Sequence, residues 1–197
     1  MTASVFPPLL FPPVDYFIAL NNSRLAVVDC HIRHNKRHKD VHRFAIASPH
    51  GRLEITVPVC RCPDCPPDRQ RTWYDICVSD HAAWWKSLPR TFETAYARTP
   101  YFDALWPEIA PLLGQQAVGR PVAELVADAN ALIRRLTGIK TPVSAALPPN
   151  LSATPYIPSE NTVKYRQTGM ENFGFVPALS ILDYIFNIGT TLPEQIP

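Results

Sequence analysis

Proline sets the main limit on how this 197-residue chain can fold, because it occurs 22 times against 7 glycines. A proline fixes its own φ angle and donates no backbone hydrogen bond, so it favours extended connections over helix and strand interiors. Four prolines within residues 7–13 predict an extended start. Five more within residues 140–163, where no hydrophobic periodicity is present, predict a proline-rich surface loop. The length suits one domain over residues 1–197.

Short strands are predicted in the N-terminal half, after a helix that begins beside Pro13. The segment "RLAVVD", ending at Asp29, has the pattern of a short buried strand. "RFAIAS" and "RLEITVPV" are joined through "PHG", which predicts a β-hairpin. The second strand alternates apolar and polar residues, so one face is expected to be buried; its members are Leu53, Ile55, Val57 and Val59.

Helices are predicted mainly in the C-terminal half. Residues 79–97 suit a helix with a kink or a break at Pro89, and residues 120–138 carry a clear 3.6-residue apolar period between Pro121 and Gly138. The fold class expected is therefore α+β. A small, mostly antiparallel sheet in the N-terminal half would be packed by helices from the C-terminal half.

The segment "SILDYIFNIG" near the end is apolar except at three positions. Ser180 suits a helix N-cap, Asp183 three residues later would complete a capping box, and Gly189 suits the helix end. Asp183 and Asn187 lie four residues apart, hence on one helix face. This polar stripe is either a cap with a solvent-facing edge or part of the wall of a pocket.

Residues 31–43, "HIRHNKRHKDVHR", form the most polar stretch, with four histidines and five Lys/Arg residues. Three interpretations are open. The stretch is a solvated loop, or it binds an anion such as a sugar-nucleotide phosphate through Lys36, Arg37 and Arg43. Otherwise, histidine pairs four residues apart hold a metal ion on a helix face.

The five cysteines do not have the spacing of a secreted disulfide framework. Cys60, Cys62 and Cys65 lie within six residues, and Cys62-x-x-Cys65 has the spacing of a zinc knuckle, so a structural zinc is one possibility and free thiols are the other. Cys30 stands between Asp29 and His31, an order that also allows a Cys/His nucleophile. No other cofactor is indicated by a motif.

The global balance of charge and apolar residues excludes some partners. A net charge of +2 gives no argument for nucleic-acid binding. The opening residues lack a basic region before an apolar one, and no apolar run is long enough for a membrane span. The cytoplasm is therefore the expected compartment.

Several segments, in order along the chain, resemble the WbqC-like protein family, especially its short form from Bacteroidetes. They cover residues 9–20, 27–36, 43–59, 78–102 and 165–189. The last of these contains a closing signature similar to that of the family, made up here of Phe175, Pro177, Leu179, Ser180, Asp183, Phe186, Asn187 and Gly189.

The resemblance implies a role in surface polysaccharide or O-antigen synthesis, with modification of an amino sugar by acyl or aminoacyl transfer. A nucleotide-activated amino sugar is then the expected ligand. Arg43 matches an arginine of the family pattern, whereas Val41, His42 and Leu88 depart from it, and a Gly-rich segment of longer members is missing. A non-catalytic binding or assembly protein with a degenerate site is therefore the alternative, and the oligomeric state stays open.

The site expected on these grounds joins three parts of the chain. Proton transfer is assigned to Asp29 or His42, and an anionic group is expected at Arg37 and Arg43. Polar substrate atoms would be positioned by the remaining candidates, which are Tyr16, Asp183 and Asn187.

Overall fold

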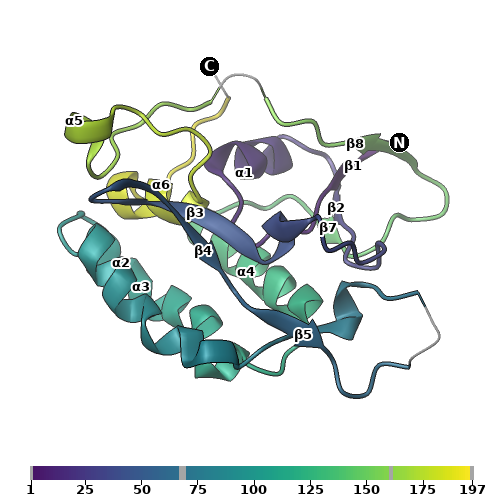
Figure 1. Ribbon diagram of the computed structural model, residues 1–197. Coiled ribbons are helices and arrows are strands. Elements are labelled where there is room, and N and C mark those ends of the chain that lie inside the picture. Colours follow the sequence, from purple (N-terminus) through teal and green to yellow (C-terminus); the bar gives the residue numbers. More distant parts are fainter. Residues whose placement is uncertain (1, 67–69, 160–161, 196–197) are drawn as a thin grey trace.

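The computed structural model describes residues 2–66, 70–159 and 162–195. Its main sheet has four strands in the order β7-β2-β1-β8, and every neighbouring pair is parallel. The strands are β1 (Thr2–Phe6), β2 (Ala26–Val28), β7 (Val143–Ser144) and β8 (Ser152–Pro155). They lie on one side of the molecule in Figure 1, with the N-terminus at the end of β1.

The parallel sheet corrects the expectation of a mostly antiparallel one. Helix α1 (Val14–Asn21) connects β1 to β2, and these strands pair with Val5 opposite Val27. A helix between adjacent parallel strands forms a βαβ unit. Strand β1 is short and directly precedes the prolines, so it carries no periodic signal. The stretch 140–163 likewise contributes β7 and β8, and Pro155 is tolerated because β8 is an edge strand.

The predicted hairpin is confirmed as the antiparallel pair β3 (Arg43–Ser48) and β4 (Gly51–Thr56). A second antiparallel pair joins β5 (Val59–Arg61) to β6 (Ile76–Val78). The prediction that one face of the second hairpin strand is buried is only partly correct. Ile55 and Val57 are buried, but Leu53 lies near the hairpin turn and is 37% exposed.

Helices cover the rest of the molecule, with α2 and α3 side by side at its lower edge in Figure 1. The remaining α-helices are α2 (Leu88–Tyr96), α3 (Phe102–Ile109), α4 (Val122–Thr137), α5 (Met170–Phe173) and α6 (Ile181–Ile188). The 3-10 helices are η1 (Lys39–Val41), η2 (Trp73–Asp75), η3 (His81–Lys86), η4 (Ala110–Leu113) and η5 (Gln115–Ala117). In the described part of the chain, no helix has the length and apolar character needed to cross a membrane.

Most helix boundaries follow the proline and glycine signals, although Pro107 lies inside α3. Helix α4 begins after Pro121 and ends at Gly138, which adopts the left-handed conformation, as predicted. Of the kink or break expected at Pro89, the structure has the break, since residues 79–97 form η3 and then α2. Pro89 falls in the first turn of α2, where its missing N–H costs nothing, so a new helix begins there.

Helix α6 is largely buried and connects the C-terminal segment to the hairpin. The Ser180 N–H donates to the Ala45 carbonyl of β3 at 2.7 Å, and the Ser180 hydroxyl accepts from the Leu182 N–H, which confirms the predicted N-cap. Five of its residues pack in the main core, namely Ile181, Leu182, Tyr184, Ile185 and Phe186.

Gly189, which ends α6, provides a test of this packing. Its φ is +102°, and an added Cβ would lie 3.0 Å from the Tyr101 ring. We expect Gly189→Ala to lower the free energy of unfolding by about 1–3 kcal/mol, measured by urea denaturation. Gly119→Ala is the control, because Gly119 also has a positive φ but open space beyond it. Equal losses in the two variants would contradict a role for the Tyr101 contact.

Candidate functional site

The His/Arg run of residues 31–43 leaves the carboxyl end of β2 and leads through η1 into β3. Two contacts hold it against a distant segment: Arg33 forms a β-bridge with Thr72, and the His34 N–H donates to the Arg71 carbonyl at 2.8 Å. Most of the run is turn and loop, with helical geometry only at η1. The histidine pairs therefore do not share a helix face, which is what the metal interpretation required.

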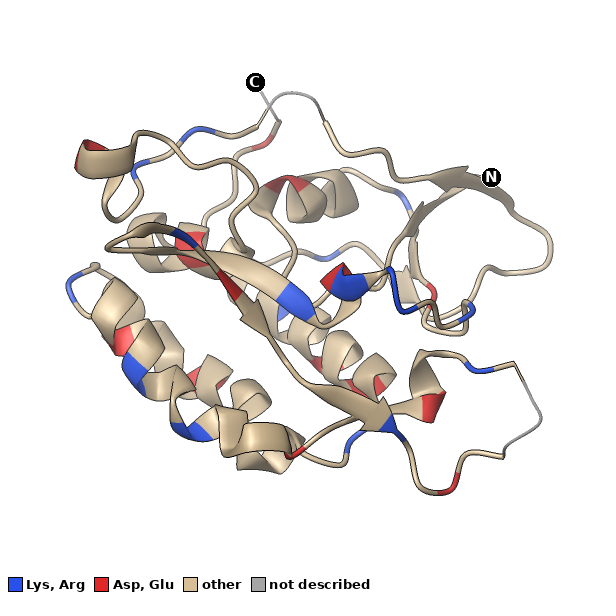
Figure 2. Cartoon of the chain, viewed as in Figure 1, with Lys and Arg blue, Asp and Glu red and all other residues tan. Residues whose placement is uncertain are grey.

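A pocket of about 430 Å³ opens where this run meets β5 and β6. Five cationic side chains line it: Lys36, Lys39, Arg43, Arg61 and Arg71. His34, His42 and Cys60 also reach its wall, and none of its described lining residues is acidic. Figure 2 shows Lys and Arg segments around η1, the start of β3 and the end of β5. We call this the basic pocket.

Arg43 is held in the basic pocket by two side-chain hydrogen bonds. Its Nε donates to Thr56 Oγ1 at 2.9 Å, and its Nη1 donates to Glu54 Oε2 at 2.8 Å. Both partners belong to β4, and Arg43 stands directly opposite Thr56 in the hairpin register. Within the described structure the Nη2 group donates no hydrogen bond. The free Nη2 group of such an oriented guanidinium can donate to a phosphate or carboxylate oxygen.

His42 has a defined tautomer in the same pocket. Its Nδ1 lies 2.8 Å from the Val57 carbonyl oxygen, which can only accept, so Nδ1 carries the proton and Nε2 keeps a lone pair. Burial lowers the pKa of His42 below its ordinary value, although the Val57 hydrogen bond acts in the opposite direction. The ring is therefore neutral at pH 7 and able to accept a proton at Nε2.

Trp73 supports both histidines of the basic pocket. The indole is 1% exposed, and its centroid lies 4.7 Å from the His34 ring in an edge-on contact and 6.2 Å from the His42 ring. Burial lowers the pKa of His34, and the nearby Arg71 and Lys36 lower it further. The Trp73 indole thus packs against two neutral imidazoles and holds them in place.

The other candidates in the N-terminal half lie outside the basic pocket. Asp29 accepts the His31 N–H at 2.7 Å and closes the turn after β2. Tyr16 is 1% exposed, its hydroxyl donates to the Pro7 carbonyl at 3.0 Å, and burial raises its pKa strongly. Arg37 lines a neighbouring hollow of about 500 Å³ formed by residues 33–37, which shares His34 and Lys36 with the basic pocket.

Asp183 is fully buried, so it does not form the solvent-facing edge allowed by the sequence. The Tyr96 hydroxyl donates to one of its carboxylate oxygens at 2.7 Å, and the Tyr165 hydroxyl donates to the other at 2.8 Å. Burial raises the pKa of Asp183, against the opposing effect of these two hydrogen bonds. Because its carboxylate is engaged by the tyrosines, the expected capping box with Ser180 is not formed.

Asn187 does reach a cavity, but a different one. Its Nδ2 donates to the Asp183 carbonyl at 2.8 Å, and its Oδ1 accepts from the Thr168 hydroxyl at 3.2 Å. The cavity that it lines lies near α5 and the end of α2 and shares no lining residue with the basic pocket. The three segments expected to form one site therefore separate: His42 and Arg43 stay together, while Tyr16, Asp29 and the α6 residues do not join them.

The cysteines are arranged around the β5–β6 pair. Cys62 forms a disulfide with Cys77, Cys65 is buried with a free thiol, and Cys60 is exposed at the basic pocket. Because its sulfur is bonded to Cys77, Cys62 cannot serve as the zinc ligand that the sequence predicted. In residues 2–66, 70–159 and 162–195, no three His, Cys, Asp or Glu side chains are grouped to hold a metal ion. Burial raises the pKa of the Cys30 thiol to about 12, which argues against a nucleophilic thiolate there.

Arg61 and Arg71 are members of the basic pocket that sequence reasoning missed. Arg61 lies 18 and Arg71 lies 28 residues after the end of the His/Arg run, in a segment outside the resemblance. The Arg33–Thr72 bridge and the hydrogen bond from the His34 N–H to the Arg71 carbonyl bring this segment to the run. The residue types of "CRCPDCPPDRQR" are the one available signal, since three arginines occur within it.

Fold and site together define an α+β protein with a parallel sheet and a strongly cationic pocket beside a β-hairpin. The model of the WbqC-like protein family matches residues 8–154, and the chain belongs to this family. No curated protein and no solved structure gives a match. The matched range includes the basic pocket but ends before α5 and α6.

Proposed function

We propose that this protein binds a nucleotide-activated amino sugar through its phosphates and takes part in amino-sugar modification for surface polysaccharide in the cytoplasm. The single observation that carries the proposal is the basic pocket, where five Lys/Arg side chains meet with no described carboxylate in the lining. A pocket of one charge sign attracts and concentrates ligands of the opposite sign. Its volume of about 430 Å³ lies within the common range for small-molecule sites.

Acyl or aminoacyl transfer to an amino group is the reaction that best fits these residues. The amine would attack an activated acyl donor such as a thioester, so that the amide bond forms, the acyl–sulfur bond breaks with the thiolate as leaving group, and the nitrogen loses a proton. His42 provides a neutral imidazole with its proton on Nδ1 and its lone pair on Nε2, which is the form needed to take that proton. Arg43 would hold the anionic part of the substrate through its unoccupied Nη2 group.

One observation favours the alternative of a binding protein without catalysis. The carboxylates assigned to the site by sequence, Asp29 and Asp183, lie outside the basic pocket, so His42 has a backbone carbonyl rather than a carboxylate as its orienting partner. The carbonyl fixes the tautomer but stabilises an imidazolium less well than a negative charge does. Ligand binding without turnover would support this alternative.

The anion site is tested by a thermal-shift titration with UDP-N-acetylglucosamine, free UDP, acetyl-coenzyme A and glycine. Binding to the native state raises the apparent stability by mass action. We expect the sugar nucleotide to raise the melting temperature of the wild type. Arg43→Ala should weaken binding by about 10- to 100-fold, because a charged hydrogen bond is worth roughly 1.5–3 kcal/mol.

Glu54→Ala is the matched control, since it breaks the same 2.8 Å ion pair but leaves the cation in place. This variant should bind the sugar nucleotide at least as well as the wild type. A second control, Arg135→Ala, removes an exposed arginine that pairs with Glu108 far from the pocket. Equal affinity of Arg43→Ala and wild type, or no shift with any phosphate-bearing probe, would end the proposal.

A further inference from the structure

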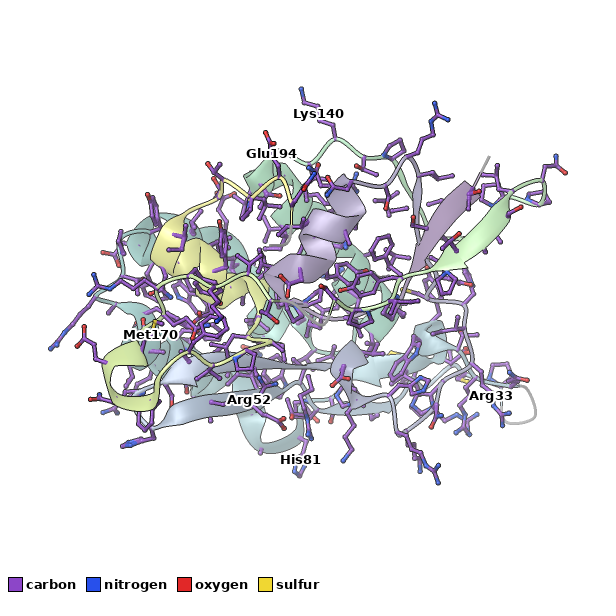
Figure 3. All side chains as sticks on the ribbon, turned by 90° about the horizontal axis from the view of Figure 1, so that it is seen from above. Arg33, Arg52, His81, Lys140, Met170 and Glu194 are labelled. Atoms are coloured by element: carbon purple, nitrogen blue, oxygen red, sulfur yellow. A yellow bond between two sulfur atoms is a disulfide. The ribbon has the colours of Figure 1, made fainter. Side chains whose placement is uncertain are left out.

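A larger cavity, of about 1010 Å³, lies at the opposite end of the β3–β4 hairpin from the basic pocket. Pro49 at the hairpin turn borders it, together with the last part of α2, residues 97–100 and the loop 166–172. The strand between Arg43 and Pro49 spans about 20 Å. In Figure 3, Met170 of this cavity and Arg33 of the His/Arg run lie at opposite ends of the molecule, with Arg52 between them. We call this the distal pocket.

The charges around the distal pocket cancel. Two carboxylates, Glu93 and Glu171, stand with two guanidinium groups, Arg98 and Arg166. Arg166 and Glu171 approach each other to 3.5 Å, and both are more than 80% exposed. The distal pocket therefore provides no excess of positive charge, in contrast to the basic pocket, and has no electrostatic preference for a phosphate-bearing ligand.

The hydroxyl groups of the distal pocket are oriented by the protein itself. Thr94 donates to the Arg90 carbonyl at 2.8 Å, Thr99 to the Tyr96 carbonyl at 2.7 Å, and Thr168 to Asn187 Oδ1 at 3.2 Å. With its proton committed, each hydroxyl oxygen presents only lone pairs to the cavity. Each is then an acceptor for a ligand hydroxyl.

Further hydrogen-bonding groups come from side chains that have no hydrogen-bond partner within the described structure. Arg98 and Asn172 border the cavity and make no side-chain hydrogen bond in the described structure, and the Glu93 carboxylate is equally free to accept. Gln167 has the opposite character, because both ends of its amide are bonded to the Val176 backbone at 2.8 Å. The distal pocket thus combines polar side chains that are held by the protein, the threonine hydroxyls and the Gln167 amide, with unpaired guanidinium, carboxamide and carboxylate groups at its border.

We propose that the distal pocket binds an uncharged carbohydrate. Sugar hydroxyls act as donors and acceptors at the same time, which matches a border of guanidinium, carboxamide and carboxylate groups facing oriented threonine oxygens. The CH faces of a sugar ring would lie against the apolar atoms of Ala95, Pro100 and Met170, which also border the cavity. A volume at the upper end of the usual range for small-molecule sites accommodates more than one sugar unit.

This site goes beyond the proposed function, because it lies too far from the basic pocket for one small ligand to fill both. It assigns Asn187 a place in carbohydrate binding, and it does so without Asp183, whose carboxylate is sealed in the core. The protein would hold a neutral glycan at one end of the hairpin and an anionic ligand at the other.

The test is binding of the folded full-length protein to a glycan array of phosphate-free, uncharged glycans, followed by titration of the strongest binder. We expect binding by the wild type and at least a tenfold loss in the double variant Arg98→Ala/Asn172→Ala. Both side chains are exposed and unpaired, so their removal should leave the fold intact. Arg90→Ala is the matched control, an exposed arginine on α2 that does not border the cavity.

This design can refute the carbohydrate site and the anion site independently of each other. Arg43→Ala should keep glycan binding while it loses UDP-N-acetylglucosamine. If no neutral glycan on the array is bound, or if glycan binding survives in Arg98→Ala/Asn172→Ala, the carbohydrate site in the distal pocket is refuted. The proposed anion site in the basic pocket is not affected by either result. A loss of glycan binding in Arg43→Ala alone would also refute the carbohydrate site in the distal pocket, since the sugar would then occupy the basic pocket.

Discussion

Replacement of Asp183 by alanine is expected to lower the free energy of unfolding by about 3–5 kcal/mol. Asp183 is fully buried and accepts hydrogen bonds from Tyr96 and Tyr165, whose hydroxyls would both lose their acceptor. Leaving a buried donor unsatisfied costs roughly 1–3 kcal/mol, and two donors are affected here. The Tyr96 hydroxyl also accepts the Ala47 N–H of β3, so the damage should extend from α6 into the hairpin.

Urea denaturation followed by circular dichroism measures this loss, with Asp103→Ala as the control. Asp103 is an exposed acid in the first turn of α3, and its removal should cost about 1 kcal/mol or less. Tyr165→Phe removes one hydrogen bond and keeps the other, so an intermediate loss is expected. A loss below about 1 kcal/mol for Asp183→Ala would show that the tyrosine–carboxylate network contributes little to the fold.

Trp73→Ala is expected to cost about 3–5 kcal/mol and to weaken anion binding at the same time. A buried tryptophan replaced by alanine leaves a large cavity that the surroundings fill only in part. Both His34 and His42 rest against this indole, so the wall of the basic pocket should lose its order. Trp73 also lies in the main core, where η2 packs on α4.

The stability effect is read from urea denaturation, and the effect on binding from the sugar-nucleotide titration at a temperature where the variant is folded. Trp85→Ala serves as the comparison, because Trp85 is only partly buried and contacts Trp84 rather than a histidine. It should cost less stability and leave binding unchanged. Unaltered affinity in a folded Trp73→Ala protein would contradict a supporting role of the indole in the basic pocket.

Elements with a strong local signal could be predicted from sequence. The hairpin β3–β4, helix α4 between Pro121 and Gly138, and the N-cap at Ser180 are confirmed because alternation, periodicity and capping are local properties. The parallel sheet could not be predicted in the same way. Its strands have two to five residues, one begins almost at the N-terminus, and another ends at a proline.

The candidate site was predictable only for residues that stand close together in sequence. His42 and Arg43 are adjacent in sequence and line the same pocket, while the anion site itself stays a prediction. The link from Arg43 to Asp183 and Asn187 rested on a resemblance between segments and not on a contact. Asp183 turns inward because Tyr96 and Tyr165 supply its hydrogen bonds, and no pattern around position 183 indicates partners 87 and 18 residues away.

The position of β1 between β2 and β8 has a consequence for how the chain reaches its folded form. The strand at residues 2–6 must wait for residues 152–155 before its second edge is covered. Contacts between such distant residues are slow to form because the loop between them must first be closed. During synthesis one edge of β1 therefore stays unpaired after β2 has been made, and this edge is open to pairing with a neighbouring chain until β8 covers it.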